Sequence, residues 1–475
     1  MVNIIVGLSK YLMIILAAVY TFSCFSVFAE HNLSAKRKVL RGQNCLMFFI
    51  QFIAYMVMYL QTQKITLLFF YLAQVVLLGA IILLYVQIYP KSSRLVVNNM
   101  CMLLCVGFIM ITRLNYEKAI KQFIFVALAV AISLVVPVII RKVKFLPKWT
   151  NVYAIVGILA LLAVALVGRT DYGAKLGFQI GGISVQPSEF VKILFVFYVA
   201  SSLRQSTELK NVIKTTAVAA AHVLILVAST DLGAALIMFV VYLVMLYVAT
   251  HQPLYILAGV GGGSTAAVLA YQLFGHIRTR VAAWKDPFAV YDNGGYQVAQ
   301  SLFAIGTGGW FGMGLYRGMP DKIPVATTDF IFSAISEEMG LIFALCLILI
   351  CLSCYVMFLN IAMQLHNQFY KLTALGLGTC YIFQVFLTIG GVTKFIPSTG
   401  VTLPLVSYGG SSILSTMIMF GIIQGLYILR EDEEEIIERK KKDELRREAG
   451  IPQKRRKRPA QKAAEKRARQ KKVQE

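Results

Sequence analysis

Long apolar runs alternate with short polar connections along this chain. Each run has about 17–25 residues, the length that an α-helix needs to cross the hydrocarbon core of a bilayer. The pattern predicts an all-α polytopic membrane protein. About thirteen spans are expected, at 4–29, 45–62, 65–89, 98–112, 123–140, 151–168, 187–203, 212–228, 232–250, 254–275, 329–358, 370–389 and 411–429.

Three connections depart from this pattern of short links. Residues 169–186 and 390–410 are long and rich in glycine, and residues 276–328 form the longest connection. Loops of more than about 15 residues are usually functional or disordered. The stretch 276–328 contains Trp284, Trp310 and the sequence "GTGGWFGMG", so we expect a large structured outer loop there.

Composition supports the membrane assignment, and the basic residues suggest an orientation. Hydrophobic residues make up 58% of the 475 positions, and the formal net charge is +23. Lys and Arg are enriched in cytoplasmic loops. Residues 35–41, 90–94 and 141–148 and the tail after Arg430 carry such clusters, which predicts an outside N-terminus and a cytoplasmic C-terminus. Residues 113–122 carry three basic residues on the predicted outer side, an exception to the rule.

The two ends of the chain allow alternative interpretations. The first apolar run could be a signal peptide, but its strong positive cluster follows the run, which favours a retained helix. The tail 430–475 begins as a charged, helix-prone segment and continues as a basic, low-complexity one. We expect a cytoplasmic tail near anionic lipid headgroups. Nucleic-acid binding is disfavoured, because no folded domain accompanies the charge.

Cysteine and histidine give no sign of a metal centre. Most of the eight cysteines lie in apolar runs, where they are expected to act as small apolar side chains. The five histidines are scattered, and neither a Walker-type loop nor a nucleophile elbow is present.

A charged side chain inside the membrane is costly and is therefore a functional candidate. Glu189 and Lys192 lie three residues apart on one face of a predicted helix and can pair. They form either an ion pair that fixes helix packing or part of a polar cavity in which Lys192 meets an anion. Asp231 stands at the start of a helix, where capping is the favoured interpretation.

The stretch "ATTDFIFSAISEEMG" (326–340) places three carboxylates at the outer end of a predicted span. Asp329 would lie at the mouth of this helix. Glu337, about 12 Å deeper and about 80° around the helix, could border the same cavity, whereas Glu338 would face neighbouring helices. A carboxylate at a low-dielectric boundary has a raised pKa, which suits a general base. Helix capping is the alternative role for Asp329.

The order of several motifs resembles that of the SEDS family (shape, elongation, division and sporulation), which includes RodA, FtsW and SpoVE. The motifs are "GGISVQPSEFVKI", "STDLGAAL", "RVAAWKDPF", "GGYQVAQSLFAIGTGGWFGMG", "TTDFIFSAISEEMGL" and "GVTLPLVSYGGSS". The resemblance spans residues 98–429 and implies a ten-helix core. Residues 1–97 would add about three N-terminal helices, and 430–475 would form the tail.

The resemblance implies a peptidoglycan glycosyltransferase that polymerises lipid II at the outer face of the bacterial cytoplasmic membrane. Asp329 matches the family's essential aspartate and would act as the catalytic base. Lys192 and Arg280 match positions suited to binding pyrophosphate, and Glu189 and Lys175 are expected to belong to the same substrate-binding set. Supporting roles are expected for other side chains of the matching motifs, namely Glu337, Glu338, Gln300, Ser301, Ser407 and Tyr408.

The same resemblance implies partners and bounds the cofactors. Substrates would be lipid II and glycan linked to undecaprenyl pyrophosphate. Partners would be a class B penicillin-binding protein and other membrane proteins of the elongation or division machinery. A divalent cation, Mg²⁺ or Mn²⁺, could share the charge stabilisation, although its ligands are unknown from the sequence.

The sequence departs from the family pattern in two places. Many members have an Arg-Trp pair where this chain has Leu176 and Gly177, so the function of that pair is in doubt here. The FtsW-type "PTKG" is replaced by "PSTG" at 397–400, which leans toward RodA or SpoVE. Two rival functions are a lipid II flippase and a non-catalytic scaffold of the wall-synthesis complex. A flippase should carry polar residues through the full membrane depth, whereas these candidates cluster near outer ends.

Overall fold

The structure, a computed structural model, describes residues 2–171, 174–180 and 183–448. Within these ranges, side chains are not described at 2–3, 169–171, 174–176, 180, 183, 443 and 446–448. The chain divides into a helical body, Met1–Ile428, and a second unit from Leu429 onward. In the second unit, Arg430 forms ion pairs with Glu431 and Glu434.

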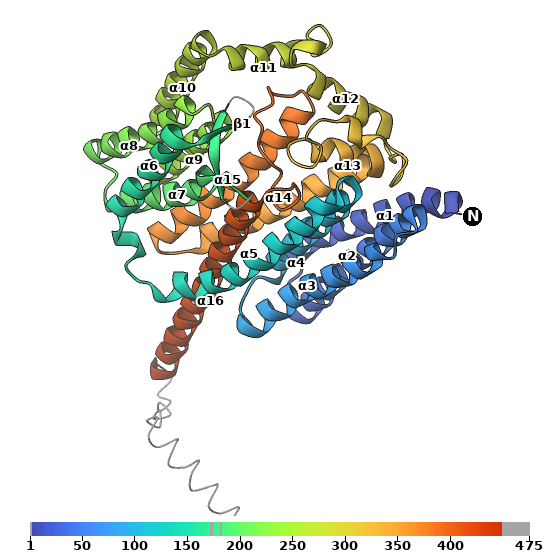
Figure 1. Cartoon of the computed structure of the whole chain (residues 1–475). Coiled ribbons are helices and arrows are strands. Elements are labelled where there is room, and N and C mark those ends of the chain that lie inside the picture. The colour runs from blue at the N-terminus through green and yellow to red at the C-terminus, as the bar shows by residue number, and fades with distance from the viewer. Residues whose placement is uncertain (1, 172–173, 181–182, 449–475) are drawn as a thin grey trace, which may run out of the picture. The chain divides into compact units, whose positions relative to one another are not determined.

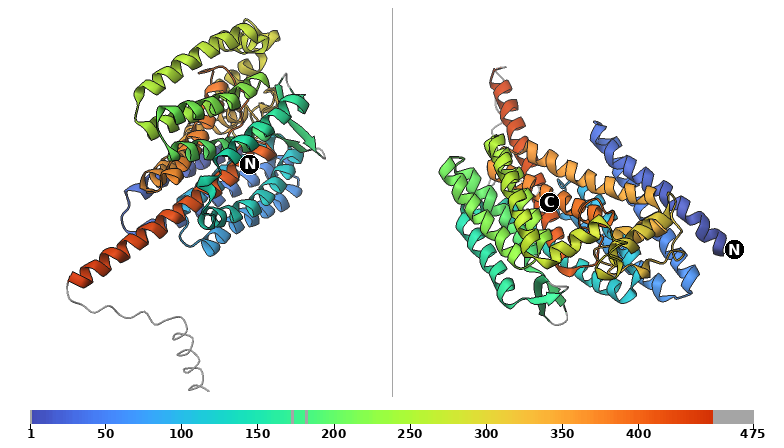
Figure 2. Two further views of the ribbon diagram at one scale, coloured as in Figure 1. Left: turned by 90° about the vertical axis from the view of Figure 1, so that its left-hand side faces the viewer. Right: turned by 90° about the horizontal axis from the view of Figure 1, so that it is seen from above.

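Helices make up almost all of the described body (Figures 1 and 2). The first nine are α1 (Val2–Ala29), α2 (Leu33–Thr62), α3 (Thr66–Ile88), α4 (Arg94–Leu114), α5 (Tyr116–Lys142), α6 (Thr150–Val167), α7 (Pro187–Gln205), α8 (Leu209–Ala228) and α9 (Leu232–Thr250). The others are α10 (Pro253–Leu273), α11 (Gly275–Lys285), α12 (Tyr296–Gly308), α13 (Ile331–Met339), α14 (Leu341–Gln364), α15 (Gln368–Val392) and α16 (Gly410–Glu448). Single 3₁₀ turns lie at Leu146–Lys148, Tyr291–Asn293 and Pro320–Lys322.

A small antiparallel sheet of three strands follows α6. Its strands are β1 (Arg169–Asp171), β2 (Ala174–Ile180) and β3 (Ile183–Val185), in the order β1-β2-β3. In β2, Gly177 lies so close to Val185 that a Cβ would be 2.2 Å from its carbonyl oxygen. The sheet therefore requires glycine at this departure from the family pattern.

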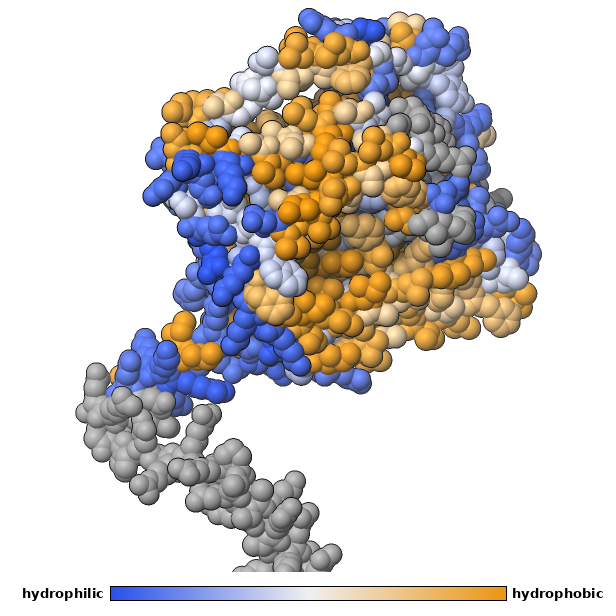
Figure 3. Space-filling view, turned by 60° about the vertical axis from the view of Figure 1, so that its left-hand side comes forward, coloured by the Kyte–Doolittle hydropathy of each residue, from blue (hydrophilic) through white to orange (hydrophobic). Residues whose placement is uncertain are grey.

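Among the described residues, twelve helices are long and apolar enough to cross a membrane. The protein is a multi-pass membrane protein. The predicted span at α7 is not among the twelve; it is a 19-residue helix that carries Glu189, Lys192 and Arg204. α7 packs against α6, α8, α9 and α15, so Glu189 and Lys192 are enclosed by other helices, whereas Arg204 is exposed near its C-terminal end. Figure 3 shows a broad apolar surface on the body, with hydrophilic residues gathered toward its ends.

Helix α4 lies at the centre of the N-terminal half, and its most apolar stretch is completely buried. The N-terminal helices α1–α3 lie along one side of the body, and α2 and α3 pack against α4 (Figures 1 and 2). Asn98 of α4 donates to Gln43 of α2 (2.9 Å), and Asn99 accepts from Tyr20 of α1 (3.1 Å). Buried polar bonds of this kind fix the register of membrane helices. The added helices are therefore part of the packed body.

Two sequence predictions of element boundaries are wrong, whereas the connection 276–328, expected to be structured, contains α11 and α12. The expected span 329–358 is divided into α13 and α14, because Gly340 has a φ of +89°. Residues 113–122 are not a loop, since α4 ends at Leu114 and α5 begins at Tyr116, with Asn115 as its N-cap.

Candidate active site

Asp329 lies in the turn that precedes α13 and faces two other segments. Gly400 has a φ of +73°, and a Cβ built there would lie 3.6 Å from Asp329 Oδ2 and 3.9 Å from Arg280 Nη2. Arg280, on α11, donates from Nη1 to the carbonyl oxygen of Ser398 at 3.3 Å. The carboxylate and the guanidinium thus meet beside a glycine that leaves room between them.

The segment 403–409 holds the Asp329 turn in place. Ser407 Oγ donates to the carbonyl oxygen of Thr328 at 2.6 Å and accepts from the backbone N–H of Leu403 at 2.9 Å. The backbone N–H of Tyr408 donates to the carbonyl oxygen of Thr327 at 2.8 Å. The two predicted supporting residues Ser407 and Tyr408 therefore contact the residues immediately before Asp329.

Helix α5 contributes a cation that the sequence analysis did not select. Lys118 Nζ donates to Thr327 Oγ1 at 2.9 Å and lies 5.6 Å from the centre of the Tyr408 ring. Gln122, one turn further along α5, donates to the carbonyl oxygen of Ser407 at 3.0 Å. The sequence signal was the basic exception at 113–122, whose Lys118 reaches the turn that carries Asp329.

Burial raises the pKa of the Asp329 carboxyl to about 6, while the nearby Arg280 guanidinium and the Thr328 hydroxyl act in the opposite direction. Burial also lowers the pKa of Arg280, and Asp329 opposes that change. A carboxylate with a pKa near 6 is mostly ionised at neutral pH and is more basic than an ordinary aspartate. It can therefore accept a proton from a bound hydroxyl group.

Glu189 and Lys192 form a buried pair in which both charges have partners. Lys192 Nζ donates to Glu189 Oε1 at 2.9 Å and to Gln384 Oε1 at 2.8 Å, and Glu189 Oε2 accepts from Ser415 at 2.9 Å. Lys192 is 3% exposed. Gln384 in turn donates to the carbonyl oxygen of Thr402 at 3.0 Å. This geometry matches the packing alternative, and the role of Lys192 in binding pyrophosphate stays a prediction.

Asp231 caps α9, as the sequence predicts. Its Oδ1 accepts from the backbone N–H of Ala234 at 3.2 Å, and its Oδ2 accepts from Ser188 Oγ at 2.8 Å. The second bond ties the beginning of α9 to the beginning of α7.

Glu338 holds Arg113 and the loop before α13 together. Its Oε1 accepts from Arg113 Nε at 3.0 Å and from the backbone N–H of Tyr316 at 3.1 Å. The Arg113 guanidinium also lies 4.1 Å from the centre of the Tyr316 ring. The structural role predicted for Glu338 agrees with these contacts. They also give Arg113, one of the basic residues of the exceptional segment 113–122, an ionic partner.

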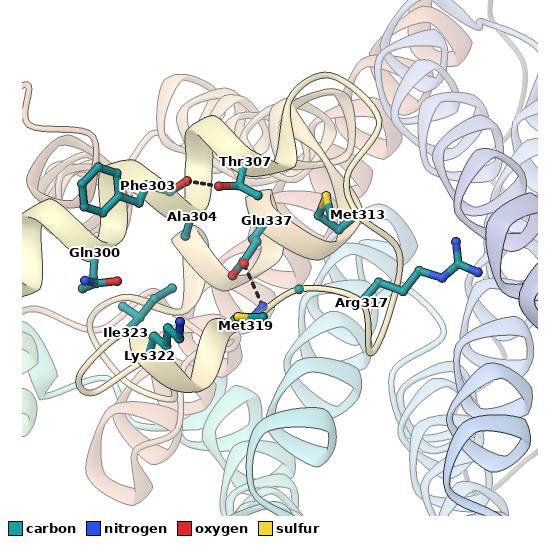
Figure 4. Close-up of a pocket in the computed structure, with 11 residues that line it drawn as sticks. Gln300, Phe303, Ala304, Thr307, Met313, Arg317, Met319, Lys322, Ile323 and Glu337 are labelled. Atoms are coloured by element: carbon teal, nitrogen blue, oxygen red, sulfur yellow. Dashed lines mark hydrogen bonds between the residues drawn. The ribbon is translucent and has the colours of Figure 1, made fainter.

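Glu337 faces a cavity of about 390 Å³ that is separate from the Asp329 turn. Its Oε1 accepts from the backbone N–H of Met319 at 2.8 Å. Gln300 and Lys322 also line this cavity, whereas the Arg317 side chain extends away from Glu337 (Figure 4). Asp329 is not among the lining residues. The prediction that both carboxylates border one cavity is wrong, because it requires a continuous helix from 329, whereas α13 begins at Ile331.

The remaining predicted residues take different positions. Gln300 donates to Tyr291 Oη at 2.8 Å within the connection 276–328. Ser301 is fully buried and bonds to Ser333 Oγ (2.6 Å) and to the carbonyl oxygen of Val392 (2.7 Å), which ties α12 to α13 and α15. Lys175 falls in β2, and its side chain lies outside the described residues.

The N-terminal end of α1 contacts the loop between α12 and α13. Lys10 Nζ donates to the carbonyl oxygen of Gly312 at 2.8 Å, and the rings of Tyr11 and Phe311 lie 5.5 Å apart. Nothing in the sequence pattern pointed to this contact, because about 300 residues separate its two sides.

Comparison with known proteins identifies the chain's relatives. The FtsW/RodA/SpoVE family, described as cell cycle proteins, matches residues 93–431. The peptidoglycan glycosyltransferase RodA of Mycobacterium tuberculosis is 32% identical over 381 residues, covering 74% of this chain and 81% of that protein. A probable peptidoglycan glycosyltransferase FtsW of Aliivibrio salmonicida is 32% identical over 343 residues, covering 69% of this chain and 85% of its own length.

Solved structures share the fold. A chain of a peptidoglycan synthase complex that coordinates polymerization and crosslinking superposes with a TM-score of 0.61 at 22% identity, covering 71% of this chain and 98% of that one. Thermus thermophilus RodA, a rod shape determining protein, superposes with a TM-score of 0.55 at 21% identity, covering 71% and 97%. The chain therefore belongs to the FtsW/RodA/SpoVE family, the SEDS family of peptidoglycan glycosyltransferases.

Proposed function

We propose that Asp329 is the general base with which this glycosyltransferase extends glycan strands from lipid II. In the reaction, the Asp329 carboxylate accepts the proton of the GlcNAc 4-hydroxyl on the acceptor. The hydroxyl oxygen forms a bond to the anomeric carbon of the donor's MurNAc. The bond from that carbon to the pyrophosphate oxygen breaks, so undecaprenyl pyrophosphate leaves with inversion. One carboxylate suffices because pyrophosphate departs without a proton, unlike the leaving group of two-carboxylate glycosidases.

The observation that carries this proposal is the meeting of Asp329 and Arg280 beside Gly400. The base and a cation lie on different segments but face one space. The leaving pyrophosphate is a polyanion, and fixed positive charge lowers the energy of a transition state in which negative charge develops. Arg280 is suited to this because its Nη1 is already oriented by the Ser398 carbonyl.

A divalent cation is proposed only as a companion of the substrate. The described residues contain no group of three His, Cys, Asp or Glu side chains that could enclose a metal ion. Mg²⁺ is often held by one or two carboxylates together with substrate phosphates. Asp329 is the carboxylate at this site that would contribute, and such an ion would add to the charge stabilisation of the leaving group. Polymerisation measured with EDTA and then with restored Mg²⁺ or Mn²⁺ tests this requirement.

We also propose the orientation and partner. Lys10, near the N-terminal end of α1, contacts the loop before α13. The basic segments 35–41, 90–94 and 141–148 lie at the α1–α2, α3–α4 and α5–α6 connections, which are at the opposite end of the N-terminal helices. The positive-inside rule then supports Asp329 at the outer face and the tail in the cytoplasm. A class B penicillin-binding protein is the proposed partner, because the related chain comes from a synthase complex that also crosslinks. Co-purification from membranes tests this association.

The decisive experiment is lipid II polymerisation by the purified chain, alone and with the penicillin-binding partner. Asp329→Asn should abolish glycan synthesis, because the amide cannot accept the proton. Asp292→Asn is the matched control, since Asp292 is exposed in the same connection 276–328. Full activity of Asp329→Asn would refute the base assignment. Transbilayer movement of lipid II in vesicles, with no polymer from the unmodified chain, would instead favour the flippase.

A further inference from the structure

A second cavity lies between α6, α7 and α8, at the end of α7 that is remote from the Glu189–Lys192 pair. It has a volume of about 400 Å³ and is lined by the beginning of α6, the end of α7 and the beginning of α8. Ser202 on its wall is thirteen residues after Glu189 along α7, which corresponds to roughly 20 Å of helix. That distance is a large fraction of a bilayer core. The Glu189–Lys192 pair is connected through Gln384 to Thr402, two residues after the Gly400 that lies beside Asp329. We therefore place the α6–α8 cavity toward the leaflet opposite to the Asp329 site.

The charged side chains that line the α6–α8 cavity are both cationic. Lys148 and Lys214 are exposed at its edge, and no acidic residue lines it. In the part of the chain that the structure describes, neither lysine forms an ion pair, although both belong to the same small cavity. Two unpaired ammonium groups around one space create a positive potential that an anion would neutralise.

The backbone of α6 adds to this potential. Trp149 precedes the helix and gives it no side-chain cap, so the N–H groups of Thr150 and Asn151 begin the helix without a capping acceptor. The first N–H groups of a helix and its dipole favour negative charge. Thr150 and Asn151 line the same cavity as the two lysines. The pieces of an anion site thus come from three separate elements.

Polar groups fix the shape of the cavity wall. Asn211 donates to the carbonyl oxygens of Ser202 (2.9 Å) and Ser206 (2.6 Å), which joins α7 to α8. Gln205 donates to Thr150 Oγ1 at 2.7 Å, which joins α7 to α6. These bonds make the cavity a preformed gap between three helices.

The surroundings favour a lipid over a soluble anion. Trp149 is 44% exposed at the cavity mouth, and aromatic residues of this kind concentrate at membrane–water interfaces. The α6 side chains that follow include three that are apolar and exposed, namely Val152, Ile155 and Val156. A headgroup in the cavity would leave its acyl chains against this apolar surface of α6. Basic pockets between membrane helices on the cytoplasmic side bind anionic headgroups.

We propose that the α6–α8 cavity binds the phosphate headgroup of an anionic phospholipid from the leaflet opposite to Asp329. Lys148 and Lys214 would contact the phosphate together with the first N–H groups of α6. The side chains of Asn151 and Gln205 would contact headgroup hydroxyls. This site is independent of the chemistry proposed for Asp329, and either can fail without the other.

The test is native mass spectrometry of the full chain in a neutral detergent, titrated with short-chain phosphatidylglycerol or phosphatidylcholine. Phosphatidylglycerol should bind preferentially, with one molecule per chain. Lys148→Gln/Lys214→Gln should weaken this binding roughly 30-fold, from the usual contribution of a lysine near anionic lipid. Lys142→Gln/Lys144→Gln removes the same charge from exposed positions outside the cavity and should leave binding unchanged.

A second variant separates binding from folding. Asn151→Asp places a negative charge in the first turn of α6, which stabilises the helix but repels a phosphate and competes for the lysines. It should fold at least as well as the unmodified chain and still lose the lipid. Equal losses in the two double variants would overturn the proposal, as would equal binding of phosphatidylcholine. Saturation by soluble glycerol phosphate at the same concentration would also overturn it in favour of a free phosphate ligand.

Discussion

The charge of Arg280 should set the pH below which the enzyme loses activity. As the proposed base, Asp329 must be ionised to accept a proton, and burial raises its pKa to about 6, with Arg280 opposing. The rate of glycan synthesis should therefore fall as the pH drops through about 6. In Arg280→Gln the opposing positive charge is gone, so the pKa of Asp329 rises and the loss of activity begins at a higher pH.

The size of this shift follows from the geometry. Asp329 Oδ2 and Arg280 Nη2 both lie within 4 Å of one point beside Gly400, so they are separated by at most about 7.5 Å. At an effective dielectric constant of about 20, two unit charges at that distance interact by roughly 2 kcal/mol. Arg280 is partly exposed, and solvent screening reduces this value by about half. The midpoint of the acid limb should thus move up by on the order of one pH unit.

The assay is the initial rate of lipid II polymerisation between about pH 5 and 8.5. Arg280→Gln will also lower the plateau rate if it contacts pyrophosphate, so the midpoint rather than the plateau is compared. Arg280→Lys keeps the charge and should keep the midpoint close to that of the unmodified chain. Arg278→Gln is the control, because Arg278 is exposed on the same helix. An unchanged or lowered midpoint in Arg280→Gln would contradict the electrostatic coupling between Arg280 and Asp329.

Three further substitutions test the contacts around the site. Gly400→Ala forces a φ of +73° on alanine and adds a Cβ beside Asp329 Oδ2; unfolding should become about 1–2 kcal/mol easier, and glycan synthesis per folded molecule should fall. Lys10→Met removes the bond to Gly312, so hydrogen exchange of that loop should accelerate while Lys10→Arg largely restores protection. Glu338→Gln leaves the largely buried Arg113 with only the exposed Asp321, at 4.0 Å, as an ionic partner. It should cost about 3 kcal/mol in thermal unfolding, an effect that would be absent if the pair were only a surface contact.

The sequence pattern predicted the helices well, because the bilayer requires long apolar runs and the side chains reveal them directly. It was least successful where a short-range conformation interrupts an apolar pattern. Gly340 breaks the span 329–358 with a φ of +89°, yet a single glycine inside an apolar run is compatible with a continuous helix. The predicted positions of Asp329 and Glu337 relative to each other were therefore wrong, because they were calculated for one helix that includes both residues, whereas α13 begins only at Ile331.

The sequence identified key residues of the candidate site but did not predict the contacts that bring them together. Asp329 and Arg280 were selected through the motif resemblance, and the structure places them beside one glycine. Their supports depend on contacts between segments far apart in the chain, which periodicity does not specify. Arg113 and Lys118 illustrate this: both violate the expected distribution of basic residues, and both form specific contacts with residues of the predicted outer segments. The signal in the sequence was the presence of basic residues on the predicted outer side of the membrane, where few are expected.

The positioning of Asp329 depends on tertiary contacts because it lies in a turn, outside any helix or strand, whose internal hydrogen bonds join Thr328 to Val325. Ser407 holds the carbonyl oxygen of Thr328, and Lys118 holds the side chain of Thr327. Arg280 is oriented by Ser398 rather than by an ion pair with Asp329. The carboxylate therefore keeps a raised pKa while its backbone is fixed from several sides. In the proposed mechanism, Asp329 thus remains reactive without being neutralised by Arg280, and Arg280 remains available to the leaving group.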